Sequence, residues 1–356
     1  MLTDHTAAAS SNSSGSLRNR RRQVIPRLEI VLLVVFAAAP IMLADYLTVF
    51  VTRVLILAML ALSFDLVWGY SGILSFGQAL FFGAAGYGVA LLARDLEITS
   101  IFVVLPAALA IGLILSFVIG AFVLLGRHPP TTIFVALGTL TGSYVADRLA
   151  RDWYYLGGQN GIPSIPPMTA GGYVFAEGPV YYYLAFTVLA IVYLVCRFVV
   201  RSQFGLALAG VREHEARIAF FGYEAPQLKL IVFSLAGAIA GFAGGLYAFH
   251  EGFVWPNMLG TVLSTQIVLY ALLGGVGTLI GPVIGVIAIE FAGFWLADSF
   301  PKIWPIILGL LLLVVTLFWP NGLIGLVVSE QERVGSFGRP FLPPRRVAAG
   351  ADDAAA

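Results

Sequence analysis

The sequence consists largely of apolar runs, most of them long enough to cross a membrane as a helix. The hydrocarbon core of a bilayer is about 30 Å thick, which an α-helix of about 20 apolar residues spans. Only 11% of the residues are charged, against about 25% in a soluble domain, so most of this surface cannot face water. The sequence therefore predicts an all-α fold, a polytopic membrane helix bundle of about ten transmembrane helices. We place the spans near residues 28–48, 51–68, 74–93, 100–125, 131–150, 180–200, 229–250, 262–280, 281–297 and 303–320.

Two polar segments flank this apolar part of the chain. Their composition predicts disordered tails at 1–27 and 329–356 around a transmembrane domain at 28–328. With both termini in the cytoplasm, 15 of the 20 Lys and Arg residues lie inside and 5 outside, as the positive-inside rule expects. Arg53 is one of the five outer charges. Without the tails the balance is 6 against 5, so this orientation depends mainly on the tails.

The sequence offers no set of residues for catalysis or metal binding. The single cysteine, Cys196, lies in an apolar run, so neither a disulfide nor a cysteine-based metal site is possible. A membrane-embedded enzyme would need a clustered nucleophile, metal ligands or paired acids. The four histidines are instead scattered, at His5, His128, His214 and His250. We therefore expect no enzyme, no metal and no cofactor, and the net charge of +1 indicates no nucleic-acid partner.

Residues 69–88 predict an interrupted helix. One span ends in a glycine-bracketed turn at 69–72, and a second helix then starts among small residues. Broken backbone at membrane depth is tolerated only where protein or a water-filled cavity satisfies its polar groups. A helix lining a translocation path and a plain interfacial loop followed by a packing helix fit this pattern equally well. The polar and aromatic residues of the second helix are Ser75, Gln78, Phe81 and Tyr87.

Four carboxylates lie in or near the predicted spans. We place Asp45 and Glu251 at the outer interface, and Asp65 and Glu290 deeper. A charge at the centre of a span costs roughly 2.5–3.5 kcal/mol on insertion scales, which makes each deep carboxylate a functional candidate. For Glu290 we favour a structural role, as an interfacial or protonated residue paired with the backbone of a neighbour. Two isolated carboxylates do not form a proton relay.

The loop at 201–228 carries the densest charge between the helices. Its segment 205–223 predicts a short cytoplasmic helix that ends at a glycine suited to a helix C-cap. Such a helix fits either docking into the groove of a soluble partner or lying on the lipid headgroups. The residues on one face of this helix are Leu208, Val211, Glu215 and Ile218.

Two glycine patterns concern helix packing and connections. Glycines at 237, 241, 244 and 245 recur at helical spacing and predict close contact between helices. The glycines at 274, 275 and 277 resemble a phosphate loop only superficially, because no lysine follows them and no strand precedes them. We interpret this second pattern as a tight connection at the cytoplasmic face.

Five stretches in this order resemble the LivM-type permeases of branched-chain amino acid ABC transporters, a family that also includes urea and short-amide permeases. The match runs from about 54 to 327. Asp65 stands where many relatives have Asn, Gln78 where His is frequent, and the FFGY sequence at 220–223 is closer to the urea branch. The five stretches are GYSGILSFGQALFFGAAGYG (69–88), GGQNGI (157–162), FGLALAGVREHEARIAFFGY (204–223, with Lys229 after it), LLGGVGTLIGPVIG (272–285) and WPNGLIG (319–325).

The resemblance implies a permease subunit in the lipid of the bacterial cytoplasmic (inner) membrane. Its partners would be a second, related permease in a heterodimer, two cytoplasmic ATPase subunits and a periplasmic substrate-binding protein. Its substrate would be a branched-chain or related small amino acid, or alternatively urea or a short amide. The implied path residues are Asp65, Ser75, Gln78, Phe81 and Tyr87. The implied residues of the coupling helix facing an ATPase are Gly205, Arg212, Glu213, Glu215, Phe220 and Gly222.

An ion-coupled secondary transporter is the rival class. It would use Asp65 or Glu290 to couple transport to protons or sodium. Against it, the sequence shows no clear repeat of two halves, which many such transporters carry. The chain also has no Walker A motif, as expected of a subunit driven by ATP hydrolysis on a partner. Under the favoured hypothesis the chain undergoes alternating access and performs no chemistry.

Overall fold

The structure, a computed structural model, describes residues 24–126, 131–299, 304–318 and 322–326. Four 3₁₀ turns and one antiparallel hairpin accompany the helices in this part of the chain. The turns are η1 (Tyr154–Leu156), η2 (Gly158–Asn160), η3 (Pro256–Met258) and η4 (Leu323–Leu326), and the hairpin pairs β1 (Met168–Ala170) with β2 (Tyr173–Phe175). The α-helices of the described residues are α2 (Val24–Met42), α3 (Asp45–Ser71), α4 (Gln78–Asp95), α5 (Ile101–Leu124), α6 (Thr132–Asp152), α7 (Pro179–Arg201), α8 (Gln203–Ala219), α9 (Ala225–Glu251), α10 (Thr261–Gly274), α11 (Ile280–Ser299) and α12 (Trp304–Phe318).

Each predicted apolar run contains one of these helices, and α8 lies in the predicted loop at 201–228. Within the described residues, four helices, α3, α5, α7 and α9, are long and apolar enough to cross a membrane. The predicted architecture, a helix bundle that crosses the membrane several times, is therefore confirmed. The count of about ten spans and the cytoplasmic side of both termini stay predictions. The small hairpin at 168–175 makes the fold mostly, rather than entirely, helical.

Two of the helices that begin earlier than the apolar runs predict change the position expected for other residues. α3 begins at Asp45, so Arg53 lies eight residues inside this helix and not in an outer loop. α2 begins at Val24, within the segment assigned to the first tail. Residues 1–23 and the second predicted tail at 329–356 lie outside the described residues.

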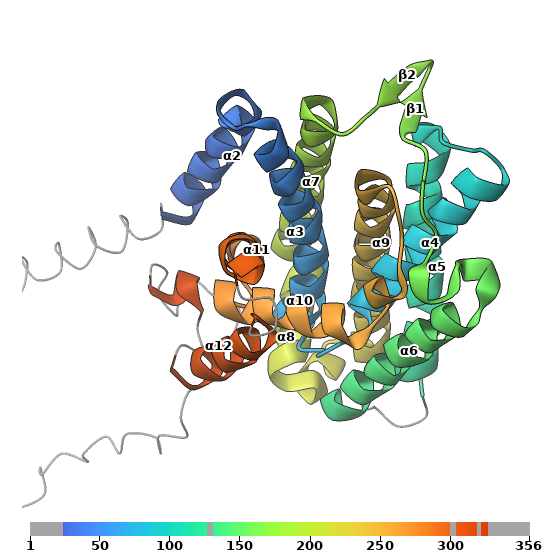
Figure 1. Ribbon diagram of the computed structural model, residues 1–356. Coiled ribbons are helices and arrows are strands. Elements are labelled where there is room, and N and C mark those ends of the chain that lie inside the picture. Colours follow the sequence, from blue (N-terminus) through green and yellow to red (C-terminus); the bar gives the residue numbers. More distant parts are fainter. Residues whose placement is uncertain (1–23, 127–130, 300–303, 319–321, 327–356) are drawn as a thin grey trace, which may run out of the picture.

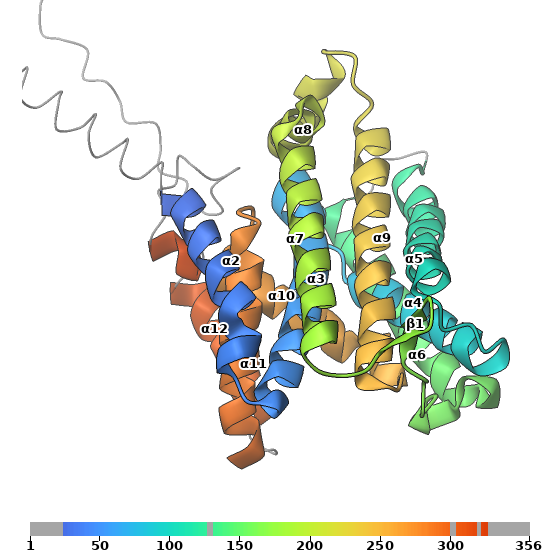
Figure 2. The same cartoon turned by 90° about the horizontal axis from the view of Figure 1, so that it is seen from above.

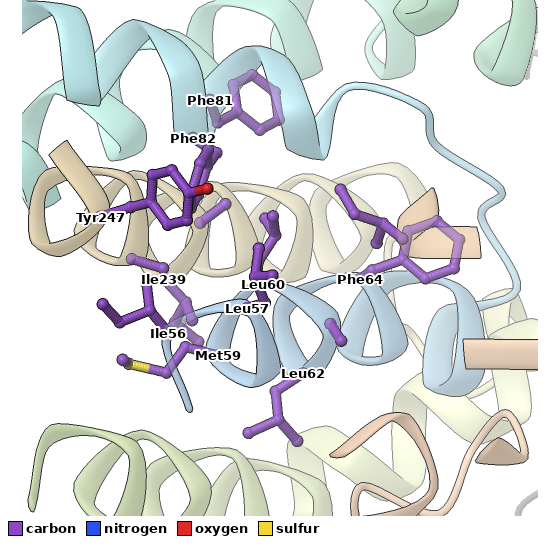
Figure 3. Close-up of a cluster of buried hydrophobic side chains, with 14 of the residues drawn as sticks. Ile56, Leu57, Met59, Leu60, Leu62, Phe64, Phe81, Phe82, Ile239 and Tyr247 are labelled. Atoms are coloured by element: carbon purple, nitrogen blue, oxygen red, sulfur yellow. The ribbon is translucent and has the colours of Figure 1, made fainter. Parts of the chain in front are cut away.

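α3 is the central helix of the bundle (Figure 1). It packs against α7, α9 and α11, and most of its length is buried within the chain. Its side chains from Ile56 to Phe64 meet Phe81 and Phe82 of α4 and Tyr247 of α9 in one apolar cluster (Figure 3). Because lipid tails are as apolar as leucine, such helices are held by close van der Waals contact rather than by exclusion of water.

α5 and α9 lie side by side along most of their length (Figure 2). Their contact is lined by glycine on both sides: a Cβ added at Gly241 would lie 2.7 Å from the Cα of Gly112. On its other side, α9 approaches α4 so closely that a Cβ at Gly244 would overlap the carbonyl oxygen of Phe82. The predicted role of these glycines in close helix packing is confirmed.

α10 and α11 form a tight helical hairpin joined by residues 275–279. A Cβ at Gly274 would overlap the carbonyl oxygen of Gly281, and one at Gly285 would overlap that of Tyr270. Gly275 and Gly277 have positive φ angles, which a residue with a side chain rarely adopts. The tight connection predicted at 274–281 is confirmed, and its cytoplasmic position stays a prediction.

Candidate translocation and coupling site

The helix interruption predicted within 69–88 is present between α3 and α4. Gly72 ends α3 in the left-handed conformation, with φ 75°, and residues 73–77 then run without helical hydrogen bonds until α4 starts at Gln78. In a membrane such a segment needs partners for its free N–H and C=O groups. They come from side chains of two other helices, α6 and α10, and from the segment itself.

Hydroxyl groups satisfy the backbone of Phe76 on both sides. Thr139 of α6 accepts a hydrogen bond from its N–H at 3.0 Å. Ser143 of α6 and Ser264 of α10 donate to its carbonyl oxygen at 3.0 and 2.8 Å. Within the segment, the Ser75 hydroxyl accepts the N–H of Gly77 at 3.1 Å. The broken backbone is therefore a built feature, held by residues about 60 to 190 positions away in the sequence.

The predicted path residues of α4 are all buried inside this chain. Gln78 accepts a hydrogen bond from Ser63 of α3 at 3.4 Å, while its amide nitrogen has no partner among the described residues. Phe81 packs edge to face against Phe233 of α9, with ring centroids 5.5 Å apart. The Tyr87 hydroxyl, also buried, has no hydrogen-bond partner within the described part either. These two buried polar groups without partners make α4 more polar than helix packing alone requires. That α4 lines a translocation path stays a prediction.

Asp65 lies on α3, one helical turn before Gly69, and is fully buried. Its Oδ1 accepts the backbone N–H of Gly277 at 2.6 Å, and its Oδ2 accepts that of Leu279 at 3.1 Å. The carboxylate thus binds the turn between α10 and α11 to the central helix. The sequence indicated a deep and costly carboxylate there, but nothing in it identified these two donors.

The predicted coupling segment forms α8, which follows α7 after a sharp bend. Ser202 caps its first turn by accepting the N–H of Gly205. A Cβ at Gly205 would overlap the carbonyl oxygen of Val200, so only glycine fits this bend. The helix is not continuous as predicted: His214 has φ −152° and ψ 87°, which splits the segment into two short helices.

α8 is docked on the ends of the bundle by residues on both sides of the break at His214. Arg212 donates a hydrogen bond to the carbonyl oxygen of Gly69 near the end of α3. Burial lowers the pKa of the Arg212 guanidinium, and the nearby Asp65 carboxylate opposes this shift. Glu215 forms an ion pair with Lys229 of α9, with the Nζ and Oε2 atoms 2.6 Å apart. Among the predicted face residues, Leu208 and Val211 are buried.

The end of the coupling segment, beyond α8, is exposed. The side chains of Phe220 and Phe221 are 91% and 78% exposed, and Glu213 is also exposed. Gly222 ends the segment with φ 81° and has no atom of another residue near a would-be Cβ, so its constraint is conformational. The six predicted coupling residues therefore divide into a docked set, Gly205, Arg212 and Glu215, and an exposed set, Glu213, Phe220 and Gly222.

These contacts form one connected route through the chain. Arg212 of α8 binds the carbonyl of Gly69, and Gly69 lies one turn from Asp65, which holds Gly277 and Leu279. A Cβ at Gly69 would lie 2.7 Å from the backbone nitrogen of Gly277, so α3 and the turn are in direct contact here. A displacement of α8 would therefore act on both α3 and the α10–α11 hairpin.

The remaining carboxylates differ in their surroundings. Glu290 of α11 is buried, and its Oε1 accepts hydrogen bonds from Tyr270 and, at 3.1 Å, from Gln266. Glu290 is paired, as predicted, but its partners are side chains, and the predicted pairing with a neighbour's backbone is wrong. Glu251 lies 3.8 Å from Arg53, an arginine inside α3 whose significance the sequence did not reveal. No group of three His, Cys, Asp or Glu in the described residues could hold a metal ion.

Comparison with known proteins identifies the family. Residues 46–316 match the family described as "Branched-chain amino acid transport system / permease component". The chain is 28% identical over 318 residues to the high-affinity branched-chain amino acid transport system permease protein LivM of Escherichia coli, covering 83% of this chain and 74% of that protein. The LivM protein of Salmonella typhimurium is 27% identical over 316 residues, covering 82% and 73%.

Another relative is a permease of an import system for a different substrate. The autoinducer 2 import system permease protein LsrC of Yersinia pestis is 27% identical over 242 residues, covering 65% of this chain and 65% of that protein. No solved structure matches the chain. The resemblance carried by the five sequence stretches is thus confirmed over most of the chain, and the chain belongs to the permease components of branched-chain amino acid transport systems.

Proposed function

We propose that this chain is one permease subunit of an ATP-driven importer for branched-chain or related small aliphatic amino acids. It acts in the bacterial inner membrane with a second, related permease, two ATPase subunits and a periplasmic binding protein. Permeases of the family lack a nucleotide site, and ATP hydrolysis on the partners drives alternating access. A urea or short-amide cargo is the alternative within the same architecture.

The observation that carries this proposal is that the coupling segment is docked on the bundle through α8 and exposed at its end. α8 is fastened to α3 by Arg212, before the break at His214, and to α9 by the Glu215–Lys229 pair, just after it. The residues that follow α8 present two exposed phenylalanines, Phe220 and Phe221, which need a partner surface if they lie in water. A segment that is held firmly on the bundle and exposes apolar side chains on its other surface is suited to transmit the movement of a docked ATPase to the bundle.

The surroundings of the deep carboxylates weigh against an ion-coupled transporter. Both oxygens of Asp65 are occupied by backbone N–H donors of the α10–α11 turn. Glu290 is held by Tyr270 and Gln266. A carboxylate that binds and releases a cation in each cycle needs access to that cation, and these two groups instead join helices to each other.

The proposed function predicts ATP-dependent uptake by the complete transporter. The chain, co-expressed with its neighbouring permease, ATPases and binding protein, should import radiolabelled leucine into proteoliposomes only when ATP is present. Omitting this chain should abolish uptake. Gradient-driven leucine uptake by the isolated chain without ATP would contradict the proposal. Uptake of urea but not of leucine would show that the transporter imports urea and not an amino acid.

A charge exchange tests the coupling role of α8. Glu215→Lys places a second cation beside Lys229, so we expect leucine uptake to fall at least about tenfold while ATP hydrolysis by the complex continues. The double variant with Lys229→Glu restores the opposite charges and should recover most of the uptake. If the double variant is as impaired as Glu215→Lys alone, the pair is not what holds α8 in place. Unchanged uptake in the single variant would refute the coupling role of this contact.

A further inference from the structure

A cavity of about 180 Å³ lies between α3, α4, α9 and α10, at the end of the bundle opposite α8. It is separate from the contacts of Asp65 and α8 described above. Its polar lining comes from Arg53, Tyr247, Asn257 and Gln266, and its apolar lining includes Leu57, Phe82, Met258 and Leu263. Figure 3 shows Tyr247 and Phe82 facing each other beside Leu57. No role follows for this cavity from the family alone.

Arg53 is the unusual member of this lining. It lies about 12 Å along α3 from the start of the helix, at a rise of about 1.5 Å per residue. A guanidinium within a membrane-spanning helix is costly, so such a residue is paired or faces a path. Its side chain is 42% exposed, which shows that the cavity is reached from the surface of this chain.

The pairing of Arg53 inside the chain is incomplete. Its contact with Glu251 spans 3.8 Å, longer than a hydrogen bond, and its Nε has no hydrogen-bond partner within the described residues. Its guanidinium also lies over the ring of Tyr247, 5.9 Å from the centroid. A guanidinium offers five N–H donors in a fork that matches the two oxygens of a carboxylate. Arg53 therefore lines a cavity without a hydrogen bond to another described residue, and its guanidinium retains donors that suit a carboxylate ligand.

The rest of the cavity is suited to the other parts of an amino acid. Gln266 and Asn257 in the lining supply polar atoms for an ammonium group. The apolar wall faces an aliphatic side chain, and a cavity of about 150 Å³ is known to hold a molecule as large as benzene. A short aliphatic amino acid fits this combination of charge, polarity and size better than urea, which has no carboxylate.

We propose that this cavity is a transient binding site for the substrate, in which Arg53 binds the α-carboxylate of an aliphatic amino acid and the wall at Leu57, Phe82 and Leu263 receives its side chain. The proposal rests on the proposed function and narrows its substrate class to amino acids with a free carboxylate. It places the site in the half of the chain remote from α8, so substrate would occupy it before the conformational change that α8 transmits.

A comparison of leucine with leucinamide tests the role of Arg53. The complete permease–ATPase complex in nanodiscs, without the binding protein, is titrated with each compound in competition with radiolabelled leucine. We expect leucine to bind at least about tenfold more tightly than leucinamide, because only leucine offers a carboxylate to the guanidinium fork. In Arg53→Gln this preference should fall to about twofold or less, and in Arg53→Lys to an intermediate value.

Two matched variants separate ligand binding from structure. Glu251→Gln removes the same ion pair without removing the guanidinium, so it should keep the preference for leucine over leucinamide. Arg148→Gln removes an exposed arginine on α6 and should leave both affinities unchanged. The proposal is overturned if the wild-type complex shows no saturable leucine binding, or if Arg53→Gln keeps the tenfold preference. If Arg53→Gln does not assemble, Arg53→Lys decides in the same way.

Uptake distinguishes failure of this site from failure of the proposed function. In the complete transporter with its binding protein, Arg53→Gln should lower ATP-driven leucine uptake at least about tenfold, with Arg148→Gln unchanged. Normal leucine uptake by Arg53→Gln would reject the site and leave the importer in place. Absence of ATP-driven leucine uptake in the wild type would reject the proposed function itself.

Discussion

Replacing Asp65 by alanine is expected to abolish transport by the complex and to reduce its stability by several kcal/mol. The change leaves two buried backbone N–H groups, those of Gly277 and Leu279, without acceptors. Each unsatisfied buried donor costs about 1–3 kcal/mol. It also removes the negative charge near Arg212 that accompanies the contact of α8 with α3. The midpoint of thermal unfolding of the purified complex and its ATP-driven uptake measure the two effects.

The asparagine variant makes this test sharper. Asp65→Asn keeps one acceptor oxygen but replaces the other oxygen by an NH₂ group. This group is a donor, and it would face the N–H donor of Gly277 or Leu279. We therefore expect an intermediate loss of stability, with uptake reduced but measurable. Asp45→Ala, at the exposed first position of α3, is the matched control and should behave like the wild type. Wild-type stability of Asp65→Ala would mean that the carboxylate does not hold the α10–α11 turn.

Replacing Gly244 by leucine is the second change expected to have a large effect. Even a single Cβ at this position would overlap the carbonyl oxygen of Phe82, which belongs to helix backbone and cannot rotate away. α4 and α9 would have to separate, and overpacking of this kind costs at least about 1–3 kcal/mol. Since Phe82 and Tyr247 of these helices also line the cavity with Arg53, we expect loss of both folded complex and leucine binding.

A glycine elsewhere in the chain provides the control. Gly138 lies in α6, where a would-be Cβ meets no atom of another residue within 4 Å. Gly138→Leu should therefore enter the membrane, assemble and transport like the wild type. Size-exclusion profiles and unfolding midpoints in detergent compare the two variants directly. Equal stability of Gly244→Leu and Gly138→Leu would show that α4 and α9 are not in the close contact described.

The proposed substrate cavity and the proposed coupling contacts lie at opposite ends of the bundle. The cavity with Arg53 lies where α3 begins and α9 ends, and the contacts of α8 lie where α3 ends and α9 begins. α3 connects both regions and is largely buried along its length. A movement of α8 against the end of α3 is therefore in a position to alter the cavity, which alternating access requires.

Much of the fold follows from the sequence alone. Apolar runs of about 20 residues predict helices, because a helix satisfies its own backbone groups in lipid. Glycines spaced three or four apart predict close helix contacts such as that of Gly241 with Gly112, although not which helix would be the partner. The glycine-bracketed turn before Ser75 was likewise visible as an interruption. Their common feature is that the cause and the effect lie within a few residues of each other.

The partners of the buried polar groups were decided by the tertiary structure. Asp65 meets Gly277 across 212 residues, Arg212 meets Gly69 across 143, and Phe76 meets Ser264 across 188. Such pairs leave no periodicity in the sequence, since each depends on how the helices cross. Arg53 illustrates the same limit: by sequence it was one outer charge among five, and only the packing of α3 against α9 and α10 placed it at a cavity. Apolar runs and family motifs are local features, so they identify a helical membrane permease from the sequence; which of its few charges meet each other, and that Arg53 lines a cavity, depends on how the helices pack.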